Sequence, residues 1–204
     1  SSTVAVANYA KKAHEKPELE SMACAAALLS TLSSLILFTM VLGTSSPELM
    51  QSVKWSLISA GIALLICAIY FIQKTGMQES LALSSTRHAF KASHALIIAL
   101  TISAVTLCSA WLRNLVGDSG TFAASVLVGL VEIHAAAVSI AQPSQQDPIQ
   151  SAYARWGVIA ILASSALSKL FLSYASGSRG YGHRMASGLG MMLISATAAM
   201  LMLE

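Results

Sequence analysis

Long runs of apolar residues, separated by short polar segments, make up most of the chain. Each run has about 20 residues, the length that an α-helix needs to cross roughly 30 Å of hydrocarbon at about 1.5 Å per residue. The apolar positions do not alternate with a period of two, and the runs are too long for barrel strands of about ten residues. The pattern therefore predicts helices that span a membrane. The runs are residues 21–42, 53–72, 92–111, 120–141, 153–174 and 185–203.

The segments between these runs have the composition of loops, because glycine, serine and proline are concentrated in them. Residues 1–20 are polar, and we expect a surface helix or a linker there. The predicted fold class is all-α, a polytopic membrane protein of about six transmembrane helices. Residues 21–112 and residues 113–204 each contain three of the predicted spans.

An internal correspondence links the second span to the fifth. A shift of 101 positions places Lys54 on Arg155 and Trp55 on Trp156 without a gap. The same shift places the first span on the fourth, and the third span roughly on the sixth. Because three spans are an odd number, the second copy would lie upside down in the membrane. We therefore expect two inverted three-helix repeats, an architecture that often has a substrate site at the repeat interface.

The composition supports a membrane protein. Hydrophobic residues make up 55% of the chain and charged residues 10%, whereas soluble domains have roughly 25% charged residues. The net charge of +3 is too small for a nucleic-acid-binding surface, so no nucleic-acid partner is expected. The three cysteines all lie in apolar runs, and their odd number argues against a disulfide framework.

The distribution of lysine and arginine predicts an orientation. With six spans, both chain ends and two of the loops share one side, which holds seven of these residues against four on the other. Basic loops are enriched in the cytoplasm, so we expect both termini there. The four basic residues assigned to the opposite side are Lys54, Arg113, Arg179 and Arg184.

Two ionisable residues lie inside the fourth span. Glu132 is about 18 Å along the helix from Gly120, close to the middle of the hydrocarbon, and a carboxylate there costs several kcal/mol unless it is paired, hydrated or protonated. His134 lies about 200° around the helix from Glu132, so the two face one ligand only if Gly129 allows local unwinding. The small and polar face beside Glu132 consists of Ser125, Gly129, Ala136 and Ser139.

These residues leave two interpretations open. In one, Glu132 and His134 bind an ion, a metal ion included, or carry a proton. In the other, a protonated Glu132 is hydrogen-bonded to a neighbouring helix and His134 is a core residue.

The fifth span contains a lysine. Lys169 lies about 24 Å from the start of its span, so its side chain is able to extend to the far interface. The alternative is a buried counter-ion. Ser164, Ser165 and Ser168 precede it and would either line a polar path or pack helices together.

Enzymatic chemistry has no recognisable residues in this chain. The sequence contains no catalytic triad pattern, P-loop, dinucleotide fingerprint, Cys-x-x-Cys or His-Glu-x-x-His motif. We therefore expect neither an enzyme nor a cofactor.

A set of residues carries a family resemblance: Glu20, Gly117-Asp118-x-Gly120, Gly129-Leu130-Val131-Glu132-Ile133-His134-Ala135, Ser139 and Ser165-x-x-x-Lys169. From about Glu20 to its end, the chain resembles the membrane domain of unknown function, family 4010, that follows the MgtC/SapB domain in many bacterial proteins. That family usually has aspartates where Glu132 and His134 stand, and an asparagine where Ser165 stands. The resemblance implies a multi-spanning bacterial inner-membrane protein and an upstream MgtC/SapB-type partner domain, but no activity.

Two functions fit these observations. The first is a transporter or channel for a small inorganic ion, with a cation favoured because the polar centre in the fourth helix contains an acid. The second is a non-transporting membrane interaction or regulatory protein related to MgtC-type systems. A homodimer is expected in both cases, because six short helices bury little surface against one another.

Overall fold

The computed structural model describes residues 2–75, 133, 136–137 and 148–202. This part of the chain is helical and contains no strand. The predicted spans at residues 92–111 and, apart from three residues, 120–141 lie outside the described residues. The helices are α1 (Ser2–Glu15), the 3-10 helix η1 (Pro17–Leu19), α2 (Glu20–Ser45), α3 (Pro47–Thr75), α6 (Pro148–Ser176) and α7 (Arg179–Leu201).

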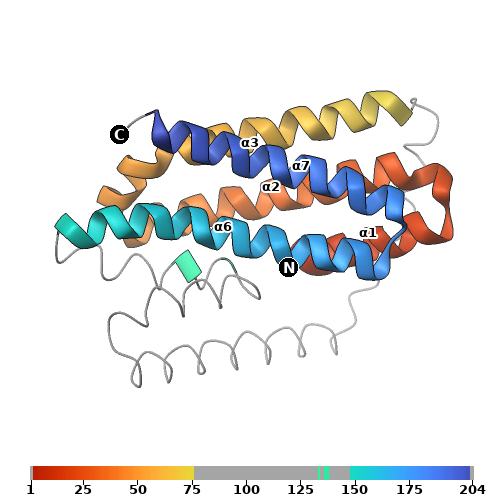
Figure 1. Cartoon of the computed structure of the whole chain (residues 1–204), viewed down its shortest axis with the longest axis horizontal. Coiled ribbons are helices and arrows are strands. Elements are labelled where there is room, and N and C mark those ends of the chain that lie inside the picture. Colours follow the sequence, from red (N-terminus) through yellow and green to blue (C-terminus); the bar gives the residue numbers. More distant parts are fainter. Residues whose placement is uncertain (1, 76–132, 134–135, 138–147, 203–204) are drawn as a thin grey trace, which may run out of the picture.

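Four of these helices, α2, α3, α6 and α7, are long and apolar enough to cross a membrane. They lie side by side in a bundle (Figure 1) and correspond to the first, second, fifth and sixth predicted spans. The prediction of a helical membrane protein is confirmed for this part of the chain.

The two short turns of the bundle follow from local sequence. Pro47 begins α3, a favoured position because its missing N–H would have no intrahelical partner. The Ser46 hydroxyl accepts a hydrogen bond from the backbone N–H of Leu49 at 3.4 Å. At the other turn, the Ser178 hydroxyl accepts from the N–H of Tyr181 at 3.1 Å. Both serines cap the helix that follows them.

Contacts between helices fix their directions. Ser59 on α3 and Ser195 on α7 each donate a side-chain hydrogen bond to the other's backbone carbonyl, at 3.1 and 3.3 Å. Further along, Cys67 on α3 lies 3.8 Å from the sulfur of Met191 on α7. The residue number rises on α3 as it falls on α7, so these two helices are antiparallel. Because α6 also runs antiparallel to α7 across their short turn (Figure 1), α3 and α6 point the same way.

This geometry does not confirm the inverted repeat. An inverted copy of three spans would place the second and fifth spans in opposite directions, whereas α3 and α6 are parallel. The structure also differs from the predicted orientation at Arg184. The sequence assigned this residue to the side of the membrane opposite the amino end, whereas Arg184 contacts Glu20 at the start of α2.

The amino-terminal segment is more buried than its polar composition predicts. Residues Ser2–Glu15 form the helix α1, which is not the exposed surface helix that the polar composition led us to expect. This helix packs against α2 and α6 at the end of the bundle where α2 begins (Figure 1). Val6, Ala10 and Ala13 are fully buried, and the Tyr181 hydroxyl donates to the Val6 carbonyl at 3.2 Å.

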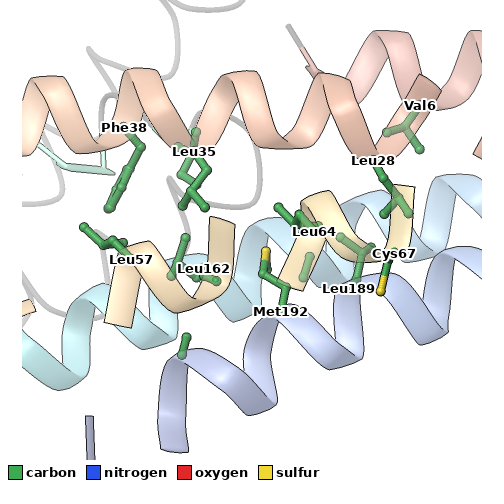
Figure 2. Close-up of a cluster of buried hydrophobic side chains, with 14 of the residues drawn as sticks. Val6, Leu28, Leu35, Phe38, Leu57, Leu64, Cys67, Leu162, Leu189 and Met192 are labelled. Carbon is green, nitrogen blue, oxygen red and sulfur yellow. The ribbon is translucent and has the colours of Figure 1, made fainter. Parts of the chain in front are cut away.

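The bundle has a packed interior and an apolar exterior. Figure 2 shows the interior, where side chains such as Leu28, Leu64 and Leu162 from different helices meet. Large apolar side chains also cover the outside, Ile62 and Ile66 of α3 among them, as lipid contact requires. Trp55 and Trp156 are exposed near one end of their helices and Tyr70 and Tyr174 near the other, the arrangement of interfacial aromatic belts.

Candidate functional site

The most deeply buried charged residue in the described part is Lys169 on α6. Its exposed fraction is 2%, and its Nζ donates a hydrogen bond to the Ser165 hydroxyl at 2.6 Å. Side chains on a helix lean towards its amino end, so the lysine reaches back along α6 to the level of Ser165. Lys169 is therefore not a snorkelling residue, and that interpretation is wrong.

The level of Ser165 is close to the middle of the bundle. Ser165 is 11 residues before Ser176, where α6 ends, which corresponds to about 16 Å along the helix. Half of a hydrocarbon core is about 15 Å. A charged group at this depth costs several kcal/mol unless polar groups surround it.

Lys169 and Ser165 line a small internal cavity of about 10 Å³, enough for roughly one water molecule. Thr31 and Ser34 of α2 supply two further hydroxyls, so polar groups from two helices face the same space. The other lining residues that the structure describes are apolar: Leu35, Ile133, Leu162, Ala166, Leu189 and Met192.

The two α2 hydroxyls differ in their partners. Thr31 donates to the Ala27 carbonyl at 2.9 Å. Ser34 is 8% exposed, and within the described residues its hydroxyl makes no hydrogen bond to protein. A buried hydroxyl without a partner costs about 1–3 kcal/mol. The Ser34 hydroxyl is therefore able to form a hydrogen bond with a molecule in the cavity.

Five residues of the sequence-predicted site, Ser125, Gly129, Glu132, His134 and Ser139, lie outside the described residues. Two of them flank Ile133, which is 8% exposed and lines the cavity. The predicted metal site of Glu132 and His134 is untested, and the described residues contain no cluster of three or more metal-ligating side chains.

Sequence reasoning did not single out Thr31 and Ser34. They lie three positions apart, and residues at that spacing share a helix face. Serine and threonine are common throughout these apolar spans, so this signal was weak.

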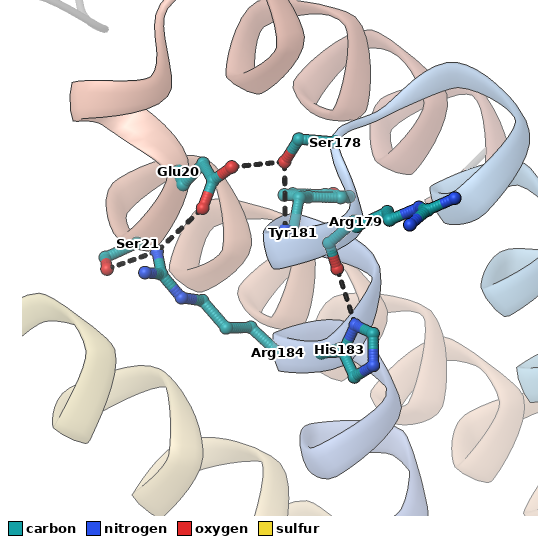
Figure 3. Close-up of polar contacts among 7 residues, drawn as sticks. All are labelled: Glu20, Ser21, Ser178, Arg179, Tyr181, His183 and Arg184. Atoms are coloured by element: carbon teal, nitrogen blue, oxygen red, sulfur yellow. Dashed lines mark hydrogen bonds and ion pairs between the residues drawn. The ribbon is translucent and has the colours of Figure 1, made fainter.

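A second polar cluster joins the beginnings of α2 and α7 (Figure 3). The Ser178 hydroxyl donates to one oxygen of the Glu20 carboxylate, and Nη1 of Arg184 lies 3.5 Å from the other. The same Arg184 nitrogen donates to the Ser21 hydroxyl at 2.7 Å. The Glu20 side chain is 13% exposed and that of Arg184 32%, so this cluster lies at the rim of the bundle. We assign it a structural role.

The rim near Glu20 is also the more basic end of the bundle. Among the described residues, six lysines and arginines lie at this end, whereas Lys54 and Arg155 lie towards the other (Figure 1). The six are Lys11, Lys12, Lys16, Lys74, Arg179 and Arg184.

The family described as "Domain of unknown function (DUF4010)" matches residues 1–177. This chain belongs to that family, as the resemblance predicted. No curated protein and no solved structure matches the chain.

Proposed function

We propose that this protein is a transporter or channel for a small inorganic ion, with Lys169 in its polar centre. The position of Lys169 supports this proposal most strongly: a fully buried amine beside a water-sized cavity near mid-depth. Because charges inside the membrane are costly, they generally mark paths for ions or protons. A bundle that served only to pack helices would have no need for this residue.

A cation is the favoured substrate. Glu132 directly precedes Ile133 in the sequence, and Ile133 lines the cavity. An acid close to Lys169 would balance its charge and supply oxygen ligands for a cation.

The orientation that we propose places the basic end in the cytoplasm of a bacterium, with the bundle in the inner membrane, since basic segments are retained there. The carboxyl end of α7 then lies on the opposite side, because α7 begins at the basic end. This proposal differs from the sequence-based expectation of two cytoplasmic termini.

A second candidate function is that of a non-transporting interaction or regulatory protein. A groove of about 610 Å³ runs between α6 and α7, with small residues such as Ala160, Ala186 and Gly190 in its walls. Small residues four positions apart allow close helix approach, so the groove would accept the same face of a second copy in a homodimer. An upstream MgtC/SapB-type domain would act through this assembly.

Ion flux into proteoliposomes tests the transport function. The purified protein is reconstituted, and flux is measured for a panel of monovalent and divalent ions with the wild type, Lys169→Met and Glu132→Gln. We expect each variant to slow flux by about tenfold or more, because a lost charge-assisted hydrogen bond is worth about 1.5 kcal/mol or more.

Lys54→Met is the matched control. Lys54 is a lysine of α3 that bonds to Gln51 at 2.9 Å and lies away from the cavity, so its replacement leaves flux unchanged. If no ion crosses at all, the transport proposal is wrong and the interaction function is favoured. If the wild type and both centre variants conduct equally, the protein transports ions but Lys169 and Glu132 take no part in it.

A further inference from the structure

The internal cavity beside Lys169 contains two hydroxyls whose hydrogen bonds are incomplete. The Ser165 oxygen accepts a hydrogen bond from the Lys169 ammonium, so its own O–H is left to donate. Within the described residues that O–H has no protein acceptor, and the Ser34 hydroxyl has no protein partner. Both groups line the same space.

One water molecule satisfies this arrangement. The cavity volume of about 10 Å³ corresponds to one water-sized particle, and buried waters typically bond to two to four otherwise unsatisfied polar groups. A water here accepts from the Ser165 hydroxyl and donates to the Ser34 oxygen. It thereby connects α6 to α2 across the interior.

We infer that the cavity of Ser34, Ser165 and Lys169 binds a single water, and that this water and the lysine form a proton-binding station. The ion that the protein couples to is then the proton. This inference rests on the proposed transport function and specifies its substrate.

The chemical step is a simple proton transfer. A hydronium ion in the cavity gives one proton to the lone pair of the neutral Lys169 amine, which forms a new N–H bond, and the hydronium O–H bond breaks to leave water. The reverse step releases the proton. The Ser34 and Ser165 oxygens hold the water in line with the amine during both steps.

The cavity walls contain no competing titratable group within the described residues. α2 contributes Thr31, Ser34 and Leu35, and α7 contributes Leu189 and Met192. The titratable residues next to Ile133 in the sequence, Glu132 and His134, lie outside the described residues.

Replacing Lys169 by arginine distinguishes two roles for this residue, a proton carrier and a fixed positive charge. Arginine keeps a positive charge but does not release its proton in proteins. If Lys169 serves only as a counter-ion, the Lys169→Arg variant retains flux. If Lys169 carries the proton, the variant loses flux.

The experiment measures proton entry into proteoliposomes that contain a pH-sensitive dye, driven by a potassium diffusion potential. The variants are Lys169→Arg, Ser34→Ala and Ser165→Ala. Ser33→Ala is the matched control, since Ser33 is exposed on α2 and bonds to the Leu29 carbonyl. Thermal unfolding in detergent identifies variants that fold, and the two serine variants are independent tests should one of them fail to fold.

We expect Lys169→Arg to abolish proton entry, and Ser34→Ala and Ser165→Ala to slow it by about tenfold, with Ser33→Ala equal to the wild type. Proton entry retained in folded Lys169→Arg, or in both folded serine variants, overturns the proton station. If the wild type moves another ion but no protons, this inference fails while the transport function stands. If the wild type moves nothing, both fail.

Discussion

At the scale of single residues, two glycines of α7 differ sharply in the space around them. A Cβ built on Gly180 would lie 2.5 Å from one carboxylate oxygen of Glu20 and 3.0 Å from the other, whereas a Cβ on Gly190 would meet nothing within 4 Å. Glu20 is held by Ser178 and Arg184. The carboxylate therefore has no room to move without breaking these contacts.

Gly180→Ala should destabilise the protein by about 1–3 kcal/mol, since the displaced carboxylate loses its partners. Gly190→Ala should be neutral or stabilise by up to about 1 kcal/mol, because alanine favours the helix. Denaturant titration in mild detergent measures both. In a Glu20→Ala background the Gly180→Ala cost should disappear; a cost that persists there would show that Gly180 is needed for another reason.

The residue scale is also where sequence reasoning reached its limit for the candidate site. Lys169 was recognisable because a lysine inside an apolar run is unusual. The direction of its side chain was not predictable from the sequence, because a snorkelling lysine and a buried lysine differ only in the neighbours that surround the side chain. Ser34 became relevant once the structure placed it at the same cavity as Lys169.

At the scale of helices, α2 and α7 approach closely at a glycine. A Cβ on Gly188 would lie 2.8 and 2.9 Å from the two terminal carbons of Leu28, and both residues are buried. Small residues at helix interfaces permit such contacts. The parallel packing of α2 against α7 depends on this pair.

We therefore predict that Gly188→Ala destabilises the bundle by about 1–3 kcal/mol through overpacking. Leu28→Ala alone should also destabilise it, by about 2–5 kcal/mol through a cavity. The double variant should be more stable than the sum of the two losses implies, because each change relieves the other. Additive losses in denaturant titrations would contradict the direct contact.

Hydropathy located the four spans within the described residues, because span length and apolar composition are properties of each segment alone. Their mutual directions were harder to infer. The pairs Lys54-Trp55 and Arg155-Trp156 suggested an inverted repeat, yet a basic residue and a tryptophan also mark any membrane interface. Two parallel helices that enter the membrane from the same side carry that signature at the same end. In α1, Val6, Ala10 and Ala13 are buried at helical spacing. This apolar face was not predicted, because the lysines beside it made the segment polar on average.

At the scale of the whole molecule, the contact between Glu20 and Arg184 sets the sidedness of the bundle. It places the η1 segment and the turn between α6 and α7 at one end, and the turn between α2 and α3 at the other (Figure 1). The six-span topology predicted from the sequence instead places the segment around Lys16 and the turn around Arg179 on opposite sides of the membrane. The two topologies therefore differ in an observable way.

Labelling of single cysteines with a membrane-impermeant maleimide distinguishes them. The three native cysteines are first replaced, and Lys16→Cys, Arg179→Cys and Glu48→Cys are made one at a time, since all three positions are exposed. We expect Lys16→Cys and Arg179→Cys to react from the same side and Glu48→Cys from the other. With the basic end in the cytoplasm, only Glu48→Cys should react in intact cells, and the other two only in inverted vesicles. Reaction of Lys16→Cys and Arg179→Cys from opposite sides would mean that the two helix beginnings do not meet in the membrane, and the cluster of Glu20 and Arg184 would then have to be abandoned.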